Sequence, residues 1–533
     1  MKWYGWGDPE RRLTLADDAI AMLRTEVGDG APDGRASLES VVVPAPRPLP
    51  VAIAETVGPA AVLTGHEHRV RRAAGRGYPD LVRLRAGRLD DAPDAVVLPG
   101  GAAEVARVLE ICGREGIGIV PFGGGTSVVG GVEPLRGSFE RLITLDLRRL
   151  RGVDVDHRSL TATLGPGLRG PAAEEALAAN GLTLGHFPQS FEYATIGGFA
   201  AARSAGQASS GYGRFDELVT AVRMTSPAGE LRTLETPHTA AGPALRELVL
   251  GSEGVLGVIT QVTARVRPAP ERRRYEAWMA PDFASGADFV RSLAQSGNVP
   301  DVIRVSDEAE TRTSLAMAGT GGGKRALLGA YLRIRRRDRG CLLICGWEGE
   351  AEAVERRRAV ATRMLRSGGA AGLGGAPGRA WERGRYEGPY LRDELLDLGY
   401  MVETLETAHT WRRLGELYDG VRAAIRTSLA AQGTPGIVMC HLSHAYQDGA
   451  SLYFTFIASR RRGAELERWR AAKAAASEAV VEAGGTITHH HGVGRDHVPY
   501  MRAEVGEVGI ETLRAAKDRL DPAGIMNPGK LLP

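Results

Sequence analysis

The sequence predicts an α+β protein with two large domains and an N-terminal extension. Its 533 residues exceed the size at which a single hydrophobic core stops growing. Near residue 270, short strand-like segments separated by glycines give way to longer helices and strands. The composition is that of an ordinary soluble protein, with 43% hydrophobic and 25% charged residues. The expected parts are an extension over 1–90, a first domain over 91–270, a second domain over 271–488, and a segment over 489–533 that returns to the first domain.

Local patterns predict the elements in order. In the extension, a helical pattern at 15–27 precedes a proline-rich linker at 44–50. The first domain is predicted to contain strands at 95–99, 117–120, 142–147, 160–164, 218–225 and 231–234, and helices at 105–112 and 171–179. The second domain is predicted to contain a flexible Gly/Ala insertion at 368–378, a strand at 452–456 and a helix at 465–483. A last helix, at 510–520, ends before Pro522.

The charge balance excludes a dedicated nucleic-acid surface, because 67 basic and 64 acidic residues give a net charge of only +3. The basic run at 333–339 is interpreted as a solvated loop, or as a weak patch for phosphate-bearing lipid. Four cysteines form no Cys-x-x-Cys pair, and neither a signal peptide nor a membrane span is recognised. These features predict a cytoplasmic protein.

A glycine-rich loop follows the predicted strand at 117–120. Successive glycines leave backbone N–H groups unshielded, and such a nest can solvate the oxygens of a pyrophosphate. A tight turn without a ligand would produce the same pattern. The loop consists of Pro121, Phe122, Gly123, Gly124, Gly125, Thr126 and Ser127.

Two further glycine-punctuated stretches lie at 188–198 and 251–260. In this order and spacing, the three motifs resemble the FAD-binding fold of the vanillyl-alcohol-oxidase (PCMH) type. Within that superfamily the chain resembles the alkyldihydroxyacetonephosphate synthase family. The segments that carry this second likeness are 1–7, 303–307, 452–456 and 488–495.

The resemblance implies a two-subdomain FAD-binding fold with an α+β cap domain. It also implies noncovalent FAD, because Thr126 stands where related oxidases tether the flavin through a histidine. The glycine loop would hold the pyrophosphate, the second stretch would flank the flavin, and the third would complete the adenosine side. The implied contacts beyond the loop are Pro188, Ser190, Thr195, Gly197, Gly198, Glu253, Gly254, Gly257 and Ile259.

The implied reaction exchanges the acyl group of 1-acyl-dihydroxyacetone phosphate for a long-chain fatty alcohol, without net redox change. Reduced flavin N5 would trap the three-carbon fragment covalently, which requires a base, an acid and cations for the phosphate. Imidazoles suit such proton transfers, and a guanidinium suits a phosphate. The family motifs fall on His489, His490, His491, Tyr453, Arg413 and Arg304.

Two departures favour an alternative. Gln189 replaces a usual aspartate, and the ending at 525–531 resembles FAD-linked 2-hydroxyacid dehydrogenases. The protein could then be a dehydrogenase or oxidase of a D-2-hydroxyacid such as lactate or glycolate. Alternatives of another class are a metal protein built on the histidine triplet with His497, and a flavin-binding module without catalysis. We expect no metal, a homodimer and, because the substrate is a lipid, peripheral membrane contact.

Overall fold

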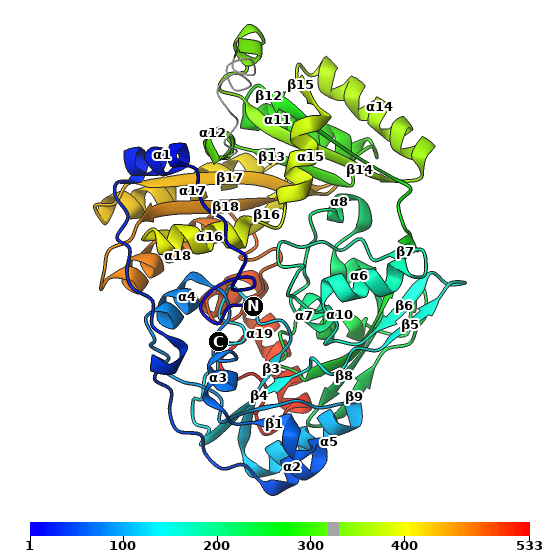
Figure 1. Ribbon diagram of the computed structural model, residues 1–533. Coiled ribbons are helices and arrows are strands. Elements are labelled where there is room, and N and C mark those ends of the chain that lie inside the picture. The colour runs from blue at the N-terminus through cyan, green and yellow to red at the C-terminus, as the bar shows by residue number, and fades with distance from the viewer. Residues whose placement is uncertain (318–329) are drawn as a thin grey trace.

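The structure is a computed structural model that describes residues 1–317 and 330–533. It has two halves, one built on two smaller sheets and the other on a seven-stranded sheet (Figure 1). Helices and strands alternate irregularly through both halves, which confirms the α+β class. Within the described residues, each helix is either too short or too polar to cross a bilayer.

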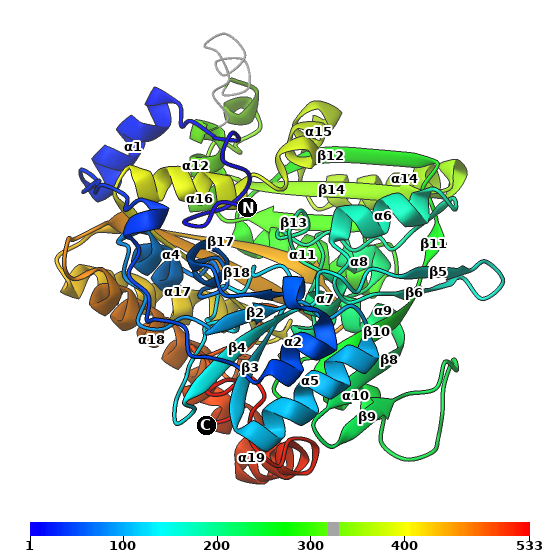
Figure 2. The same cartoon turned by 60° about the horizontal axis from the view of Figure 1, so that its bottom comes forward.

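The first sheet of the lower half in Figure 1 has the order β1-β2-β4-β3, with β2 and β3 parallel to β4. Its strands are β1 (Val62–Leu63), β2 (Ala95–Val97), β3 (Ile117–Phe122) and β4 (Arg141–Asp146). Helix α5 (Ala102–Glu115) connects β2 to β3 and buries Val105, Val108 and Leu109 against this sheet. Figure 2 shows α2 (Val51–Val57) beside α5, where it joins the same core.

The second sheet is antiparallel and has the order β5-β6-β10-β8-β9. Its strands are β5 (Val153–Asp156), β6 (Thr161–Leu164), β8 (Val219–Ser226), β9 (Gly229–Arg232) and β10 (Val258–Arg265). The helices of this region are α6 (Gly170–Ala178), α7 (Ile196–Ala201), α8 (Ser209–Tyr212), α9 (Phe215–Leu218) and α10 (Leu245–Val249). A short pair, β7 (Leu182–Thr183) and β11 (Arg267–Pro268), lies beside it.

The upper half contains an antiparallel sheet of order β15-β12-β14-β13-β17-β18-β16 (Figure 1). The strands are β12 (Arg272–Ala280), β13 (Val302–Ser306), β14 (Cys341–Gly349), β15 (Ala371–Gly374), β16 (Tyr400–Thr410), β17 (Gly436–Ala445) and β18 (Gly449–Ser459). The helices are α11 (Phe283–Gln295), α12 (Glu308–Met317), α14 (Ala351–Ser367), α15 (Gly375–Gly384), α16 (Gly388–Asp397), α17 (Leu414–Ala431) and α18 (Glu465–Glu482).

Both ends of the chain connect the halves. In the N-terminal segment, α1 (Asp17–Val27) packs on the upper sheet and α3 (His66–Val70) lies near the lower half. Helix α4 (Tyr78–Arg85) buries Tyr78 and Leu81 in the core of the upper half. The C-terminal segment passes through α19 (Met501–Leu520) and then runs beside β3. There Ile119 donates its N–H to the Ile525 carbonyl at 2.8 Å, and Asn527 donates to the Ile119 carbonyl at 2.7 Å.

The predicted strands near 95–99, 117–120, 142–147, 160–164, 218–225, 231–234 and 452–456 are confirmed. The prediction of a flexible insertion at 368–378 is wrong, because this stretch forms β15 and the start of α15. Its small residues serve close packing: a Cβ on Gly378 would lie 2.6 Å from the backbone nitrogen of Glu276. The last helix begins at Met501, earlier than the predicted start at residue 510. Its helical backbone is interrupted at Gly506.

Candidate functional site

A row of polar side chains crosses one face of the seven-stranded sheet. The register pairs Glu406 of β16 with Tyr453 of β18, and Tyr453 with His441 of β17. Ser306 of β13 lies opposite His441, which places Arg304 two residues away on the same face. Since directly opposed residues share a face, the strands bring Tyr453 and Arg304 into one row with two unpredicted residues, Glu406 and His441.

Glu406 anchors the predicted histidine segment. Its carboxylate accepts the backbone N–H of His489 at 2.7 Å and of His490 at 2.9 Å, and also that of His491. The Thr488 hydroxyl donates to the same carboxylate at 3.0 Å. Four donors therefore approach a group that offers about four lone-pair positions. The Glu406 side chain is buried, so these bonds are shielded from water.

Burial and Glu406 together set the charges of this cluster. Burial raises the pKa of Glu406, but the histidines and their N–H donors outweigh it and hold that pKa well below its usual range. Burial lowers the pKa of His490 to about 4 against the attraction of Glu406, and it also lowers the pKa values of His489 and His491. These lowered pKa values favour the uncharged imidazole, which is the form that can accept a proton.

The predicted His490, His491 and Tyr453 lie together. The ring centroid of His490 is 4.9 Å from that of His491 and 6.3 Å from that of Tyr453. The rings of Tyr453 and His441 stack at 4.8 Å, and the His444 ring lies 5.1 Å from that of His490. Aromatic and imidazole rings thus form one continuous cluster, in which His441 and His444 are additions to the predicted set.

Arg304 joins this cluster through Glu310. The Arg304 guanidinium forms an ion pair with Glu310, and the Nδ1 atom of His441 lies 3.2 Å from the same carboxylate. Burial raises the pKa of Glu310, but Arg304 and His441 outweigh burial and lower it to about 2. The strands β16 and β17 contain polar residues among otherwise apolar ones, namely Glu406, His441 and His444. Such polar residues inside an apolar strand are a sequence signal that could have identified these three as site residues.

The side-chain hydrogen bonds of Arg413 go to Glu416 and not to the predicted histidines. The chain leaves the sheet after Thr410, and Arg413 stands directly before α17. Its side chain is 42% exposed and forms an ion pair with Glu416 at 2.9 Å. A surface pair within one helical turn is the ordinary role of such an arginine.

Two other cations lie near His491. Arg392 of α16 donates to the Arg76 carbonyl at 2.7 Å, but its buried Nε atom has no hydrogen-bond partner. Lys473 of α18 is 6% exposed and makes no hydrogen bond or ion pair with the described residues. Both cations help to lower the pKa of His491, after burial. Lys473 stands four residues after the buried Trp469, a position on the apolar stripe that marks it in the sequence.

The three glycine-punctuated stretches meet at one place. A Cβ on Gly123 would lie 2.3 Å from the Thr195 hydroxyl oxygen. A Cβ on Gly254 would lie 2.9 Å from Pro121. Loops at 121–127, 188–198 and 251–259 can approach this closely only where side chains are absent.

This cradle fits the pyrophosphate of FAD. Within the described residues, the backbone N–H groups from Gly123 to Ser127 donate to no protein acceptor. Unpaired donors that converge in a glycine loop are suited to anionic oxygens. Gly125 has a φ of +66°, which a residue with a side chain would rarely adopt. Thr126 belongs to the same loop, so the whole predicted motif lies in the cradle.

The second predicted stretch forms a turn and a short helix. The Pro188 carbonyl accepts the N–H of Phe191, and the Ser190 carbonyl accepts that of Tyr193. Thr195 caps α7 by accepting the Gly198 N–H at 3.3 Å. In α7, Gly197 allows close contact with Pro166, and in the third stretch Gly257 allows close contact with Thr225.

Glu253 and Ile259, predicted to lie on the adenosine side, make structural contacts. The Glu253 carboxylate accepts the N–H of Val493 at 2.6 Å and of Gly494 at 2.8 Å. Burial raises its pKa to about 7, and these donors oppose that rise. Glu253 therefore attaches the C-terminal segment to the lower half. Ile259 is buried in the core of the second sheet, because the strand β10 turns its side chain inward.

We predict that Gly124→Ala prevents FAD binding. The new Cβ would lie 2.1 Å from the Tyr193 carbonyl oxygen, a backbone atom that cannot rotate away. The purified variant should lack the visible flavin absorbance. The matched control is Gly101→Ala, whose Cβ would meet no heavy atom within 4 Å. Equal flavin content in both variants would contradict the prediction.

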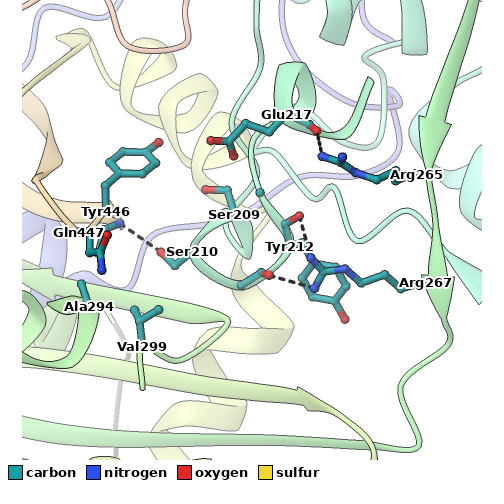
Figure 3. A pocket seen from close by; sticks show the side chains of 13 residues that line it. Ser209, Ser210, Tyr212, Glu217, Arg265, Arg267, Ala294, Val299, Tyr446 and Gln447 are labelled. Carbon is teal, nitrogen blue, oxygen red and sulfur yellow. Dashed lines mark hydrogen bonds between the residues drawn. The ribbon is translucent and has the colours of Figure 1, made fainter. Parts of the chain in front are cut away.

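An open groove of about 570 Å³ lies between the two halves (Figure 3). Ser209 lines it from the lower half, and Tyr446 lines it from the upper half. The Ser209 hydroxyl lies 2.7 Å from Nδ1 of His444, and the Tyr446 hydroxyl lies 2.8 Å from Nε2 of His489. The wall of the groove therefore makes direct contact with the histidine cluster.

Glu406, His490 and His491 could also hold a metal ion by geometry, since their ligand atoms lie within 4.8 Å of one another. The carboxylate, however, already accepts three backbone N–H groups and a hydroxyl. A metal would have to compete with these donors for the same lone pairs. The donor set therefore favours a hydrogen-bonded anchor over a metal centre.

Comparisons with known proteins agree with this geometry. Residues 93–235 match the family of FAD binding domains, and residues 269–531 match the C-terminal domain of FAD linked oxidases. The chain is 32% identical to an alkyldihydroxyacetonephosphate synthase of Dictyostelium discoideum, over 100% of this chain and 93% of that protein. It is also 29% identical to the glycolate oxidase subunit GlcD of Bacillus subtilis, over 82% of this chain and 89% of that one.

A solved structure of alkyldihydroxyacetonephosphate synthase superimposes with a TM-score of 0.86 at 29% identity, covering 100% of this chain and 99% of that chain. The structure of p-cresol methylhydroxylase has a TM-score of 0.67 at 16% identity, covering 90% of this chain and 95% of that one, which shows a shared fold. The predicted two-subdomain FAD-binding fold with a cap domain is thereby confirmed. The chain belongs to the alkyldihydroxyacetonephosphate synthase family of FAD-dependent enzymes.

Proposed function

We propose that this enzyme makes an ether-lipid precursor, exchanging the acyl group of 1-acyl-dihydroxyacetone phosphate for a long-chain fatty alcohol. One observation carries the choice of substrate: Arg392 has a buried nitrogen without a partner, and the buried Lys473 is unpaired, both near His491. Neither cation forms an ion pair within the described residues, although Asp496 lies near Lys473 and Asp393 lies near Arg392. Their free donors suit a phosphate, which carries up to two negative charges and offers more acceptor oxygens than the single carboxylate of a 2-hydroxyacid.

In the proposed reaction, His490 acts as the base beside the substrate ketone. Its Nδ1 atom is occupied by His489, whereas its Nε2 atom has no hydrogen-bond partner among the described residues. His491 and the Tyr453 hydroxyl border the same space and would donate to the carbonyl oxygen. FAD, held by the glycine loop, would supply a nucleophilic nitrogen, N5, for the exchange of carboxylate and alcohol.

We also propose that FAD binds noncovalently, because the glycine loop offers Thr126, whose hydroxyl is a poor site for a flavin bond, where related oxidases have a histidine. Precipitation of the protein with acid should release all the yellow colour into solution. Colour that stays with the precipitate would contradict this proposal. The homodimer and peripheral membrane contact stay predictions, to be tested by light scattering and by sedimentation with vesicles.

The function is tested with purified enzyme, acyl-dihydroxyacetone phosphate and a fatty alcohol. We expect release of the fatty acid and formation of the ether product in equal amounts. Separately, an anaerobic visible spectrum is recorded with D-lactate or glycolate. Bleaching by a hydroxyacid with release of the ketoacid, and no ether product, would make the protein a dehydrogenase instead.

We predict that Arg392→Met raises the KM for the phosphorylated substrate by roughly tenfold to a hundredfold, as expected for loss of one charge-assisted hydrogen bond. Arg413→Met is the matched control, because that arginine is paired with Glu416 at the surface. It should leave KM unchanged. If instead Arg413→Met raises KM while Arg392→Met does not, the phosphate site proposed here is wrong.

A further inference from the structure

The proposed exchange produces a proton that must leave a buried site. An ester and an alcohol become an ether, a carboxylate and one proton, so each turnover releases one H⁺. His489 is buried, whereas the groove reaches the cluster at Tyr446. We propose that the proton leaves through His489 and the Tyr446 hydroxyl into the groove; this inference rests on the proposed function.

The hydrogen bonds form a continuous line. Nδ1 of His490 lies 3.0 Å from Nδ1 of His489, and Nε2 of His489 lies 2.8 Å from the Tyr446 hydroxyl. His489 therefore uses both ring nitrogens, which is the arrangement that lets an imidazole accept a proton on one side and release another on the opposite side. No other residue of the cluster is bonded both to His490 and to the groove wall within the described chain.

The neighbouring histidine shows the contrast. His444 is hydrogen-bonded to Ser209 at the groove, but it meets His490 only by a ring contact at 5.1 Å. A ring contact without a hydrogen bond transmits no proton. Of the two routes from His490 to the groove, the one through His489 and Tyr446 is therefore hydrogen-bonded along its whole length.

Arg214 lies close to the Tyr446 hydroxyl. Burial raises the pKa of Tyr446, and the charge of Arg214 opposes that rise. The Arg214 guanidinium is itself paired with Asp216 at 3.0 Å. Because a guanidinium stays charged, it makes the Tyr446 O–H a better donor toward water in the groove.

The transfer balances as follows. His490 Nε2 takes a proton from the substrate, and His490 Nδ1 passes its own proton to Nδ1 of His489. Nε2 of His489 gives its proton to the Tyr446 oxygen, and the Tyr446 O–H gives its proton to water in the groove (Figure 3). One proton enters the line and one leaves it, and no electron pair is gained or lost overall.

The test is Tyr446→Phe, which removes the hydroxyl and keeps the ring. We expect kcat for ether formation to fall at least about tenfold, with KM for the phosphorylated substrate and flavin content unchanged. Small proton carriers in the groove should restore the rate, so kcat of the variant should rise with imidazole concentration at constant pH and ionic strength. The wild-type rate should show no such rise.

Tyr212→Phe is the matched control. Tyr212 lines the same groove, but its hydroxyl is bonded to Glu348 at 2.9 Å rather than to a histidine. This variant should keep the wild-type kcat, and its kcat should not change with imidazole concentration. An unchanged rate in Tyr446→Phe, or a loss that imidazole does not relieve, would overturn the relay. Failure of the proposed function is seen separately, because the wild-type enzyme would then form no ether product.

Discussion

His490→Ala is expected to lower kcat by roughly two to four powers of ten while leaving FAD bound, which is the usual contribution of a general base. His490 lies at the centre of the ring cluster and keeps one nitrogen free for the substrate. Its backbone N–H, which helps to bind Glu406, is retained in alanine. The variant should therefore fold, stay yellow and bind the phosphorylated substrate. The measurement is kcat together with the ratio of flavin to protein absorbance.

A surface histidine supplies the control for this variant. His157 is exposed in the turn between β5 and β6, far along the chain from the cluster, and contacts Asn180. His157→Ala should behave as wild type. If His490→Ala loses FAD or unfolds, the residue has a structural role and the assignment as base is wrong.

Glu406→Gln is expected to cost activity by about two to three powers of ten, although Glu406 touches no substrate in the proposed reaction. An amide presents one oxygen and one NH₂ group, so at least one N–H of the segment His489 to His491 would face another donor. Breaking a buried charged arrangement costs about 3–5 kcal/mol, which corresponds to this loss in rate. The measurements are kcat/KM and the thermal midpoint, both of which should fall.

The control is Glu403→Gln on the same strand. Glu403 is also buried, and its two carboxylate oxygens accept the Trp469 indole N–H and the Thr404 backbone N–H, so the amide of glutamine meets a donor here too, but this carboxylate holds no histidine. The control should keep most of its activity. If Glu406→Gln is as active as the control, the histidines do not depend on this anchor. Restoration of activity in Glu406→Asp would separate loss of the charge from loss of side-chain length.

The sequence patterns predicted those features whose geometry depends only on residues that are neighbours in the chain. The glycine loop at 121–127 and the His489–His491 triplet are contiguous, so their geometry follows from the chain itself. Glu406 and His441 could not be placed in the same way, because the register of β16, β18 and β17 sets their position. Apart from the hairpin of β17 and β18, that register depends on the pairing of β16 with β18, in which Glu406 lies opposite Tyr453, 47 residues further along the chain.

The surroundings of Arg413 could not be derived from the sequence for a related reason. Arg413 stands only seven residues beyond Glu406, but β16 ends at Thr410 and the chain then leaves the sheet. Conversely, Arg392 and Lys473 lie on helices remote in sequence and converge only through packing. Glu253 shows the same limit: its motif suggested a cofactor contact, and the structure uses it to hold backbone N–H groups of Val493 and Gly494.

Two carboxylates from different halves hold adjacent stretches of one short segment. Glu406 of the upper half binds the backbone of residues 489–491, Glu253 of the lower half binds that of 493–494, and only Gly492 lies between. A hinge rotation of the halves would have to break one of these sets. Opening the halves would thus disturb the histidine segment, so we expect substrate and product to exchange while the halves stay closed.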